Sequence, residues 1–200
     1  MIKWCFTSIV NIFVINPENI SKSNDFYVPI YIFETLLRDR IVEYLEIDDR
    51  FGANWLEAIK NNEYLFNKIN EIISKITVKT NSKPNIHDVF ATISLGDIIN
   101  IFTPDNISKS KLSGMLSHVF KIKSSQAGHK TMQTDIYKKM TAVLKLRNDI
   151  FHFKPIVGNI NYSHIDKTIN NFIYHLAHSK EMVEYLRAQF KINIHQPPII

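Results

Sequence analysis

Hydrophobic residues recur at intervals of three and four along most of the chain, the spacing that places side chains on one face of an α-helix. The pattern predicts six helices, over about residues 29–47, 55–76, 85–102, 105–120, 131–151 and 164–190. Strand-like alternation occurs only over residues 2–15. We therefore expect an all-α bundle of about five to six helices, with a short extended arm at the N-terminus.

Breaks in this pattern suggest how the chain is divided. A polar stretch over residues 16–24 precedes Pro29, which suits the first turn of a helix. Gly96, inside the third predicted helix, predicts a close helix crossing or a bend. Two hundred residues with 45% hydrophobic content are enough for one domain. We expect an N-terminal arm over residues 1–24, a helical domain over residues 25–192 and a tail over residues 193–200.

Composition narrows the function classes. Only five glycines argue against a glycine-rich phosphate loop. A single cysteine, Cys5, excludes an intramolecular disulfide and a thiolate metal cluster, and it favours the reducing cytoplasm. The apolar stretch over residues 1–15 contains polar interruptions and is shorter than a membrane span, so we expect no membrane association.

Three histidines near the last predicted helix could bind a metal: His164, His175 and His178. No carboxylate or cysteine completes a ligand set at a diagnostic spacing, and we expect neither a metal nor another cofactor.

The net charge of +5 permits attraction to a polyanion without requiring it. Residues 109–145 form the most basic region, since their only acidic residue is Asp135. Many of these lysines should simply lie on solvent-exposed faces of helices. The strongest candidates for contact with RNA phosphates are Lys138, Lys139, Lys145 and Lys154.

The candidate chemistry lies at the end of the helix predicted over residues 131–151. Arg147 offers a planar, permanently charged set of donors suited to phosphate, and His152 can exchange a proton near neutral pH. Asn148 and His152 share a helical face, whereas Arg147 lies about 140° away from His152 on an ideal helix. Pro155 should loosen the helix near His152, or a second copy could bring the groups together. The spacing alone is weak evidence.

Two further polar residues, Glu34 and Arg38, lie on the first predicted helix at the i,i+4 spacing of an ion pair. A solvated pair of this kind is worth only a few tenths of a kcal/mol, and that reading stays open beside a functional one.

Four segments together, residues 34–41, 51–55, 93–102 and 147–156, resemble the Abi-like (abortive infection, AbiD/AbiF type) branch of the HEPN superfamily. The resemblance covers roughly residues 27–190. Arg147, followed by Asn148 and His152, is similar to the superfamily's Arg-x4-6-His motif. The segment from Glu34 to Arg38 is similar to its Glu-x-x-Leu-Arg-Asn helix. Phe151 and Asp39 depart from the residues that are common in the family.

The resemblance implies a helical bundle that dimerises so that two Arg/His motifs face a shared groove. It also implies metal-independent endoribonuclease activity in antiviral defence or as a toxin, which an antitoxin or regulatory protein would restrain. His152 would then act as a general acid or base, and Arg147 would stabilise the phosphorane. Asn148 would orient the imidazole or the phosphate. Glu34 and Arg38 would support the site from the neighbouring helix.

Two alternatives use the same residues differently. In one, the chain binds RNA or a protein partner without cutting, with His152 satisfied in the core. In the other it is a structural or regulatory protein that does neither. Some HEPN proteins are not catalysts, so catalysis does not follow from the fold.

Overall fold

The computed structural model describes residues 17–47, 54–109, 112, 114–121, 129–152, 154–156, 162, 164–192 and 194. These residues form ten helices and no strand, so the predicted all-α class is confirmed and the predicted number of helices is too low. The helices are α2 (Pro17–Ile47), α3 (Leu56–Ile59), α4 (Glu63–Thr80), α5 (Ile86–Thr92), α6 (Leu95–Ile101), α7 (Pro104–Lys109), α8 (Met115–Phe120), α9 (His129–Phe151), α10 (Ile165–Ala177) and α11 (Lys180–Phe190). The extended arm predicted over residues 2–15 lies outside the described residues.

The additional helices arise because polar residues interrupt the predicted ones. At three of these breaks a side-chain oxygen accepts a hydrogen bond from a backbone N–H three residues later and starts a new helix. The residues are Asn62 before α4, Ser94 before α6 and Ser179 before α11. At the last break His178 adopts a left-handed conformation (φ 61°), which ends α10. Hydrophobic periodicity continues across such short interruptions, so a prediction made from periodicity alone joins two neighbouring helices into one.

A close helix crossing or a bend was predicted at Gly96, and no bend lies at this residue. The break lies at Ile93 and Ser94, before Gly96, which is inside α6. A Cβ atom added at Gly96 would lie 3.7 Å from Cδ2 of Leu144, an ordinary van der Waals contact. The packing of α6 against α9 therefore does not require a glycine at this position.

The predicted start of the first long helix at Pro29 is wrong, because α2 begins at Pro17 and continues through Pro29. Pro17 occupies the first helical position, where a missing N–H costs nothing. Pro29 leaves the carbonyl of Asp25 without its helical partner. Asp25 is exposed, so water can satisfy that carbonyl. Residues 17–24 are consequently helical rather than part of an arm.

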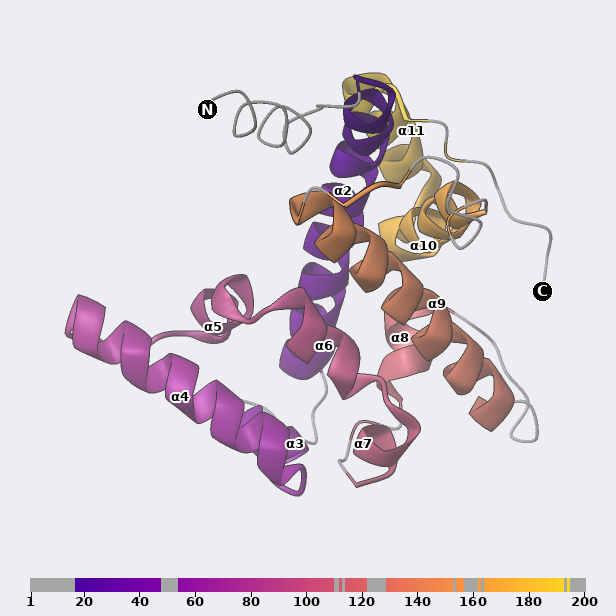
Figure 1. Ribbon diagram of the computed structural model, residues 1–200. Coiled ribbons are helices and arrows are strands. Elements are labelled where there is room, and N and C mark those ends of the chain that lie inside the picture. Colours follow the sequence, from indigo (N-terminus) through magenta and orange to yellow (C-terminus); the bar gives the residue numbers. More distant parts are fainter. Residues whose placement is uncertain are drawn as a thin grey trace, which may run out of the picture.

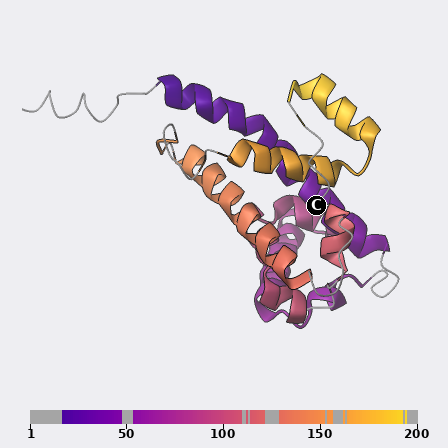
Figure 2. The same cartoon turned by 90° about the vertical axis from the view of Figure 1, so that its right-hand side faces the viewer.

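The long helix α2 is the centre of the bundle, and α5, α8, α9 and α10 pack against it (Figure 1). The second view shows α10 lying along α2, with α9 crossing beside them (Figure 2). The predicted apolar face of this helix is buried in full and consists of Ile30, Phe33, Leu37, Ile41, Tyr44 and Leu45. One continuous core therefore fixes α9 relative to α2.

Polar contacts fix the segment that follows α9. Asn19, near the start of α2, accepts a hydrogen bond from the backbone N–H of Ile156 (2.6 Å) and donates one to the carbonyl of Lys154 (3.4 Å). At the end of α9 the side chain of Asp149 accepts hydrogen bonds from Lys154 (2.9 Å) and from the hydroxyl of Tyr162. These contacts hold the C-terminal end of α9 beside the N-terminal half of α2.

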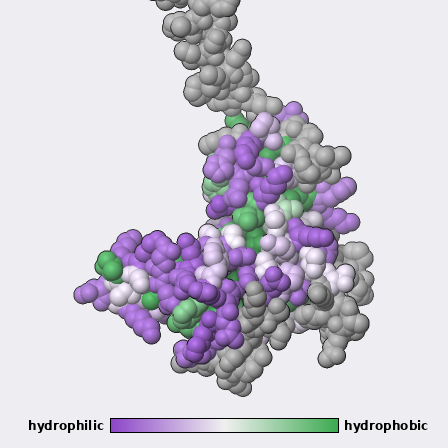
Figure 3. All heavy atoms as spheres, turned by 60° about the horizontal axis from the view of Figure 1, so that its bottom comes forward, coloured by the Kyte–Doolittle hydropathy of each residue, from purple (hydrophilic) through white to green (hydrophobic). Residues whose placement is uncertain are grey.

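Hydrophilic side chains predominate on the face seen in Figure 3, where hydrophobic ones form small areas between them. No helix in the described part of the chain combines the length and apolar composition needed to cross a membrane.

Candidate functional site

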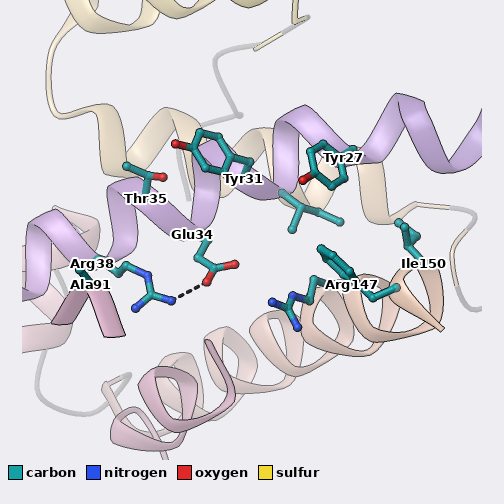
Figure 4. Close-up of a pocket in the computed structure, with 10 residues that line it drawn as sticks. Tyr27, Tyr31, Glu34, Thr35, Arg38, Ala91, Arg147 and Ile150 are labelled. Atoms are coloured by element: carbon teal, nitrogen blue, oxygen red, sulfur yellow. Dashed lines mark hydrogen bonds and ion pairs between the residues drawn. The ribbon is translucent and has the colours of Figure 1, made fainter. Parts of the chain in front are cut away.

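A cavity of about 300 Å³ lies between α2, α5 and α9. Tyr27, Tyr31, Glu34 and Arg38 of α2 line one side, Arg147 and Phe151 of α9 line the other, and Ala91 of α5 contributes to one end. Glu34 and Arg38 point from α2, and Arg147 from α9, into the same gap between the two helices (Figure 4). Residues from the two segments that were singled out separately in the sequence therefore share one site.

Arg147 is partly buried in the wall of this cavity and is poorly satisfied. Its guanidinium carbon lies 4.5 Å from the centre of the Phe151 ring, one helical turn further along α9. One terminal nitrogen donates a long hydrogen bond of 3.3 Å to Oδ1 of Asn148. The Nε atom is buried and has no hydrogen-bond partner among the described residues. A buried donor left in this way costs about 1–3 kcal/mol, which calls for an explanation.

The opposite wall is rigid. Arg38 donates hydrogen bonds to the backbone carbonyls of Phe90 and Ile93, the latter at 2.6 Å, and forms an ion pair with Glu34 at 2.5 Å. The side chains of Arg38 and Glu34 are 16% and 21% exposed, so this is not the solvated pair considered from the sequence. Because two carbonyls fix Arg38, the ion pair in turn fixes the Glu34 carboxylate at the cavity.

His152 lies outside the cavity wall. Its backbone N–H donates to the carbonyl of Asn148 (2.9 Å), which closes the last turn after α9 ends at Phe151. The imidazole is exposed and is not satisfied in the core, contrary to one alternative considered above. A single copy of the chain thus places Arg147, but not His152, in the wall of this cavity.

The four candidate RNA-binding lysines differ in their surroundings. Lys139 forms an ion pair with Asp135 (2.7 Å), and Lys154 forms one with Asp149 (2.9 Å). Lys145 lies over the ring of Tyr162, with its Nζ atom 5.9 Å from the ring centre. Lys138 is exposed and has no acidic partner among the residues that the structure describes. It is therefore the lysine of this set with most to gain from a phosphate.

Two aromatic side chains of the cavity, Tyr27 and Tyr31, were not identified from the sequence, whereas Phe151 was noted there without a role in a cavity. Tyr27 and Phe151 face each other with ring centres 6.1 Å apart, and Tyr31 lies one turn further along α2. A signal was present, because Tyr27, Tyr31, Glu34 and Arg38 follow one another at helical spacings of four, three and four. Tyr27 was missed because the helix was predicted to start at Pro29, and Tyr31, inside that predicted helix, was not singled out.

Asp149 and Tyr162 form a second cluster that the sequence did not indicate. The Tyr162 hydroxyl and then Lys154, through their hydrogen bonds, lower the pKa of Asp149 below its ordinary value. Burial raises the pKa of Tyr162 to about 12, and the hydrogen bond to Asp149 acts in the same direction. The pair holds the end of α9 with Asp149 ionised and Tyr162 neutral.

Two of the three histidines considered as metal ligands, His175 and His178, are partly buried. Nε2 of His178 lies 2.9 Å from the carbonyl oxygen of Val119, and burial lowers the pKa of both His178 and His175. No group of three or more His, Cys, Asp or Glu side chains in the described ranges is placed to hold a metal ion.

This cavity combines a cation that has no ion-pair partner among the described residues, a fixed carboxylate and exposed aromatic rings. Such a set can bind a phosphate through Arg147 and an adjacent flat, hydrogen-bonding group through the other residues. Comparisons with protein-family models, with curated proteins and with solved structures found no match to this chain.

Proposed function

We propose that this protein is a metal-independent endoribonuclease of the HEPN type that acts in antiviral (abortive infection) defence or as a toxin. The observation that supports the proposal best is the incomplete hydrogen bonding of the Arg147 guanidinium, which lines a cavity. Among the described residues it has no carboxylate or backbone carbonyl partner, and it donates one long hydrogen bond to the side-chain oxygen of Asn148. A phosphate would supply the missing acceptors. An Arg held in place before the substrate arrives can stabilise the charge that develops on phosphorane oxygens.

The proposed reaction is an internal transfer at one phosphate. The ribose 2′-oxygen attacks the adjacent phosphorus while His152 removes the 2′-hydroxyl proton. The bond from phosphorus to the 5′-oxygen of the next nucleotide breaks, and that oxygen receives a proton. The products are a 2′,3′-cyclic phosphate and a 5′-hydroxyl, so no water is consumed in this step. Asn148, which contacts Arg147, would help to orient it.

The proposal includes a homodimer. The exposed position of His152 beyond the end of α9 allows the imidazole of one copy to approach a phosphate held by Arg147 of another. Two copies would also supply two imidazoles, one to accept the 2′-hydroxyl proton and one to protonate the leaving 5′-oxygen. An antitoxin or regulatory protein that covers this region would restrain the activity.

The test is to incubate the purified protein with total RNA and with tRNA in EDTA and to examine the RNA on a denaturing gel. We expect fragments with 5′-hydroxyl ends from the wild type, and intact RNA with His152→Ala and with Arg147→Ala. The matched control is His164→Ala, which removes another exposed histidine, whose side chain makes no capping hydrogen bond to α10. Equal cleavage by wild type and His152→Ala would contradict the proposal.

A non-catalytic RNA-binding module is the second candidate, and one observation favours it. His152 does not line the cavity that contains Arg147 in a single copy. This candidate predicts that RNA stays intact with every variant, and that binding weakens as salt concentration rises. Binding that depends on Arg147 but not on His152, with no change in RNA length, would establish it.

A further inference from the structure

We propose that the cavity between α2, α5 and α9 holds one unpaired nucleobase next to the phosphate bound by Arg147, and that Glu34 makes guanine the preferred base. This inference rests on the proposed function, because it takes RNA to be the molecule that Arg147 binds. It adds a substrate preference and a second role for Glu34.

The first argument is the exposure of aromatic rings around the cavity. Tyr27, Tyr31 and Phe151 are 54%, 61% and 49% exposed although each is large and apolar. They line a cavity with a cation in its wall. Aromatic rings beside a positive charge are the usual platform for single-stranded nucleic acid, since a base stacks on the ring while its phosphate meets the cation. The Arg147 guanidinium, itself stacked on Phe151, extends that flat surface.

The second argument is the acceptor at the opposite wall. One oxygen of Glu34 accepts the hydrogen bond from Arg38, and the other has no partner among the described residues. The carboxylate cannot turn away freely, because Arg38 is held by the carbonyls of Phe90 and Ile93. It is therefore a preorganised pair of acceptors that faces the cavity.

Guanine matches this acceptor best. Its Watson–Crick edge presents two adjacent donors, N1–H and the 2-amino group, which a carboxylate accepts together. Adenine and cytosine place a ring nitrogen acceptor beside their amino group, and uracil places carbonyl oxygens beside its N3–H, so each would set an acceptor against Glu34. A buried site that pairs with a donor discriminates against ligands that lack it.

The size and position of the cavity limit the ligand to an unpaired base. A volume of about 300 Å³ is at the lower end for small-molecule sites and suits one base rather than a base pair. A base in a duplex already uses its Watson–Crick edge. The expected substrates are loops and single strands, with cleavage next to a guanine.

The test measures binding separately from cleavage. Five short oligouridine strands with 2′-O-methyl riboses, which cannot be cut by 2′-hydroxyl attack, carry guanine, inosine, adenine, cytosine or no substitution at the centre. Fluorescence anisotropy with the full chain should show guanine bound on the order of tenfold more tightly than the other bases. Inosine lacks only the 2-amino group, so it should fall between guanine and uracil.

Glu34→Gln should remove the guanine preference, so that the five strands bind with similar affinity. Glutamine can still accept the hydrogen bond from Arg38, and thermal melting checks that the variant is folded. The control is Glu57→Gln on α3, which removes another ion-paired carboxylate outside the cavity and should keep the preference. Phe151→Leu should weaken binding of all five strands.

The outcomes separate this inference from the proposed function. Equal affinity for all five strands overturns the inference, even if cleavage in EDTA depends on His152. Guanine-selective binding without cleavage supports the proposed guanine site and contradicts the proposed nuclease activity. Light scattering tests whether a second copy of the chain, rather than RNA, covers the aromatic rings. If Tyr27→Ala converts a dimer to a monomer and no strand is preferred, the rings form a subunit contact and the inference is wrong.

Discussion

Two arginine side chains line the same cavity, but the protein surrounds them differently. Arg38 on α2 has two backbone carbonyls and a carboxylate as partners. Arg147 on α9 has one long hydrogen bond to Asn148, a ring beneath it and a buried Nε atom without a partner in the described part of the chain. Both are partly buried, so exposure to water does not explain the difference.

The contrast indicates which arginine is structural and which is available to a ligand. Arg40 and Arg187 resemble Arg38, since each binds a backbone carbonyl and a carboxylate. A guanidinium that already binds a carboxylate and a backbone carbonyl has less to gain from a phosphate. Arg147 has more to gain, because it is partly desolvated and makes one long hydrogen bond among the described residues, so an anion would supply the missing acceptors.

The largest expected effect comes from removing Arg147, which has no ion-pair partner in the part of the chain that the structure describes. Arg147→Ala should lower the rate of RNA cleavage by about 100- to 1,000-fold, the usual loss when one preorganised donor to an oxyanion is deleted. The free energy of unfolding should fall by less than about 1 kcal/mol, because the lost contacts with Asn148 and Phe151 are offset by removal of the buried Nε donor, which has no partner among the described residues. Single-turnover cleavage and urea denaturation measure the two quantities. If Arg147→Ala lost activity only because it lost stability, Arg147 would be a structural residue like Arg38.

Removing Arg38 should affect stability much more than removing Arg147. Arg38→Ala leaves two carbonyls and the Glu34 carboxylate without their partner, so the free energy of unfolding should fall by about 3 kcal/mol. Urea denaturation measures this change. Lys60→Ala is the control, since it breaks an exposed ion pair with Glu57 and should cost less than about 1 kcal/mol. If the two variants were equally stable, the Arg38 contacts would not be structural.

A smaller effect is expected at the end of α9. Tyr162→Phe removes the donor to the Asp149 carboxylate and should cost about 1.5 kcal/mol near neutral pH. The measurement is the free energy of unfolding of both proteins across pH. Tyr185→Phe, which alters an exposed tyrosine, is the control.

The pH dependence of that difference follows from the two pKa values. The pKa of Asp149 is lowered in the folded protein, so its contribution is present above its ordinary value of 3.8 and is lost as the pH falls through the lowered value. The pKa of Tyr162 is raised from 10.0 to about 12, so its contribution is present below pH 10.0 and is lost as the pH rises toward 12. The difference between wild type and Tyr162→Phe should be constant between these limits. A difference that grew above pH 10.0 would contradict this assignment.

The smallest effect concerns the lysines. Lys138→Ala should weaken RNA binding slightly and reduce the slope of log affinity against log salt by about 1, because one phosphate contact is lost. Lys139→Ala should change the slope less, since Lys139 is paired with Asp135. A salt titration by anisotropy compares the two. Equal slopes for both variants would show that the ion pair does not decide which lysine meets RNA.

Local patterns in the sequence were enough to predict much of the fold. The helix predicted over residues 131–151 corresponds to α9, and the apolar face predicted for the first long helix is buried. The spacing of Glu34 and Arg38 correctly predicted an ion pair. Each of these depends on residues within a few turns of each other, where helical geometry alone determines which side chains meet.

Other features were decided only by contacts between distant residues. Hydrophobic periodicity and local spacing could not show that Glu34 and Arg147 would line one cavity, which only the family resemblance implied. They also could not show that Asp149 would meet Tyr162, or that Asn19 would hold the segment after α9. Nor could these patterns show that Arg38 finds two backbone carbonyls while Arg147 finds none in the described residues. Periodicity fixes the face of a helix on which a residue lies, but the partner that the face meets depends on how helices pack, and partners determine whether a buried charge is satisfied.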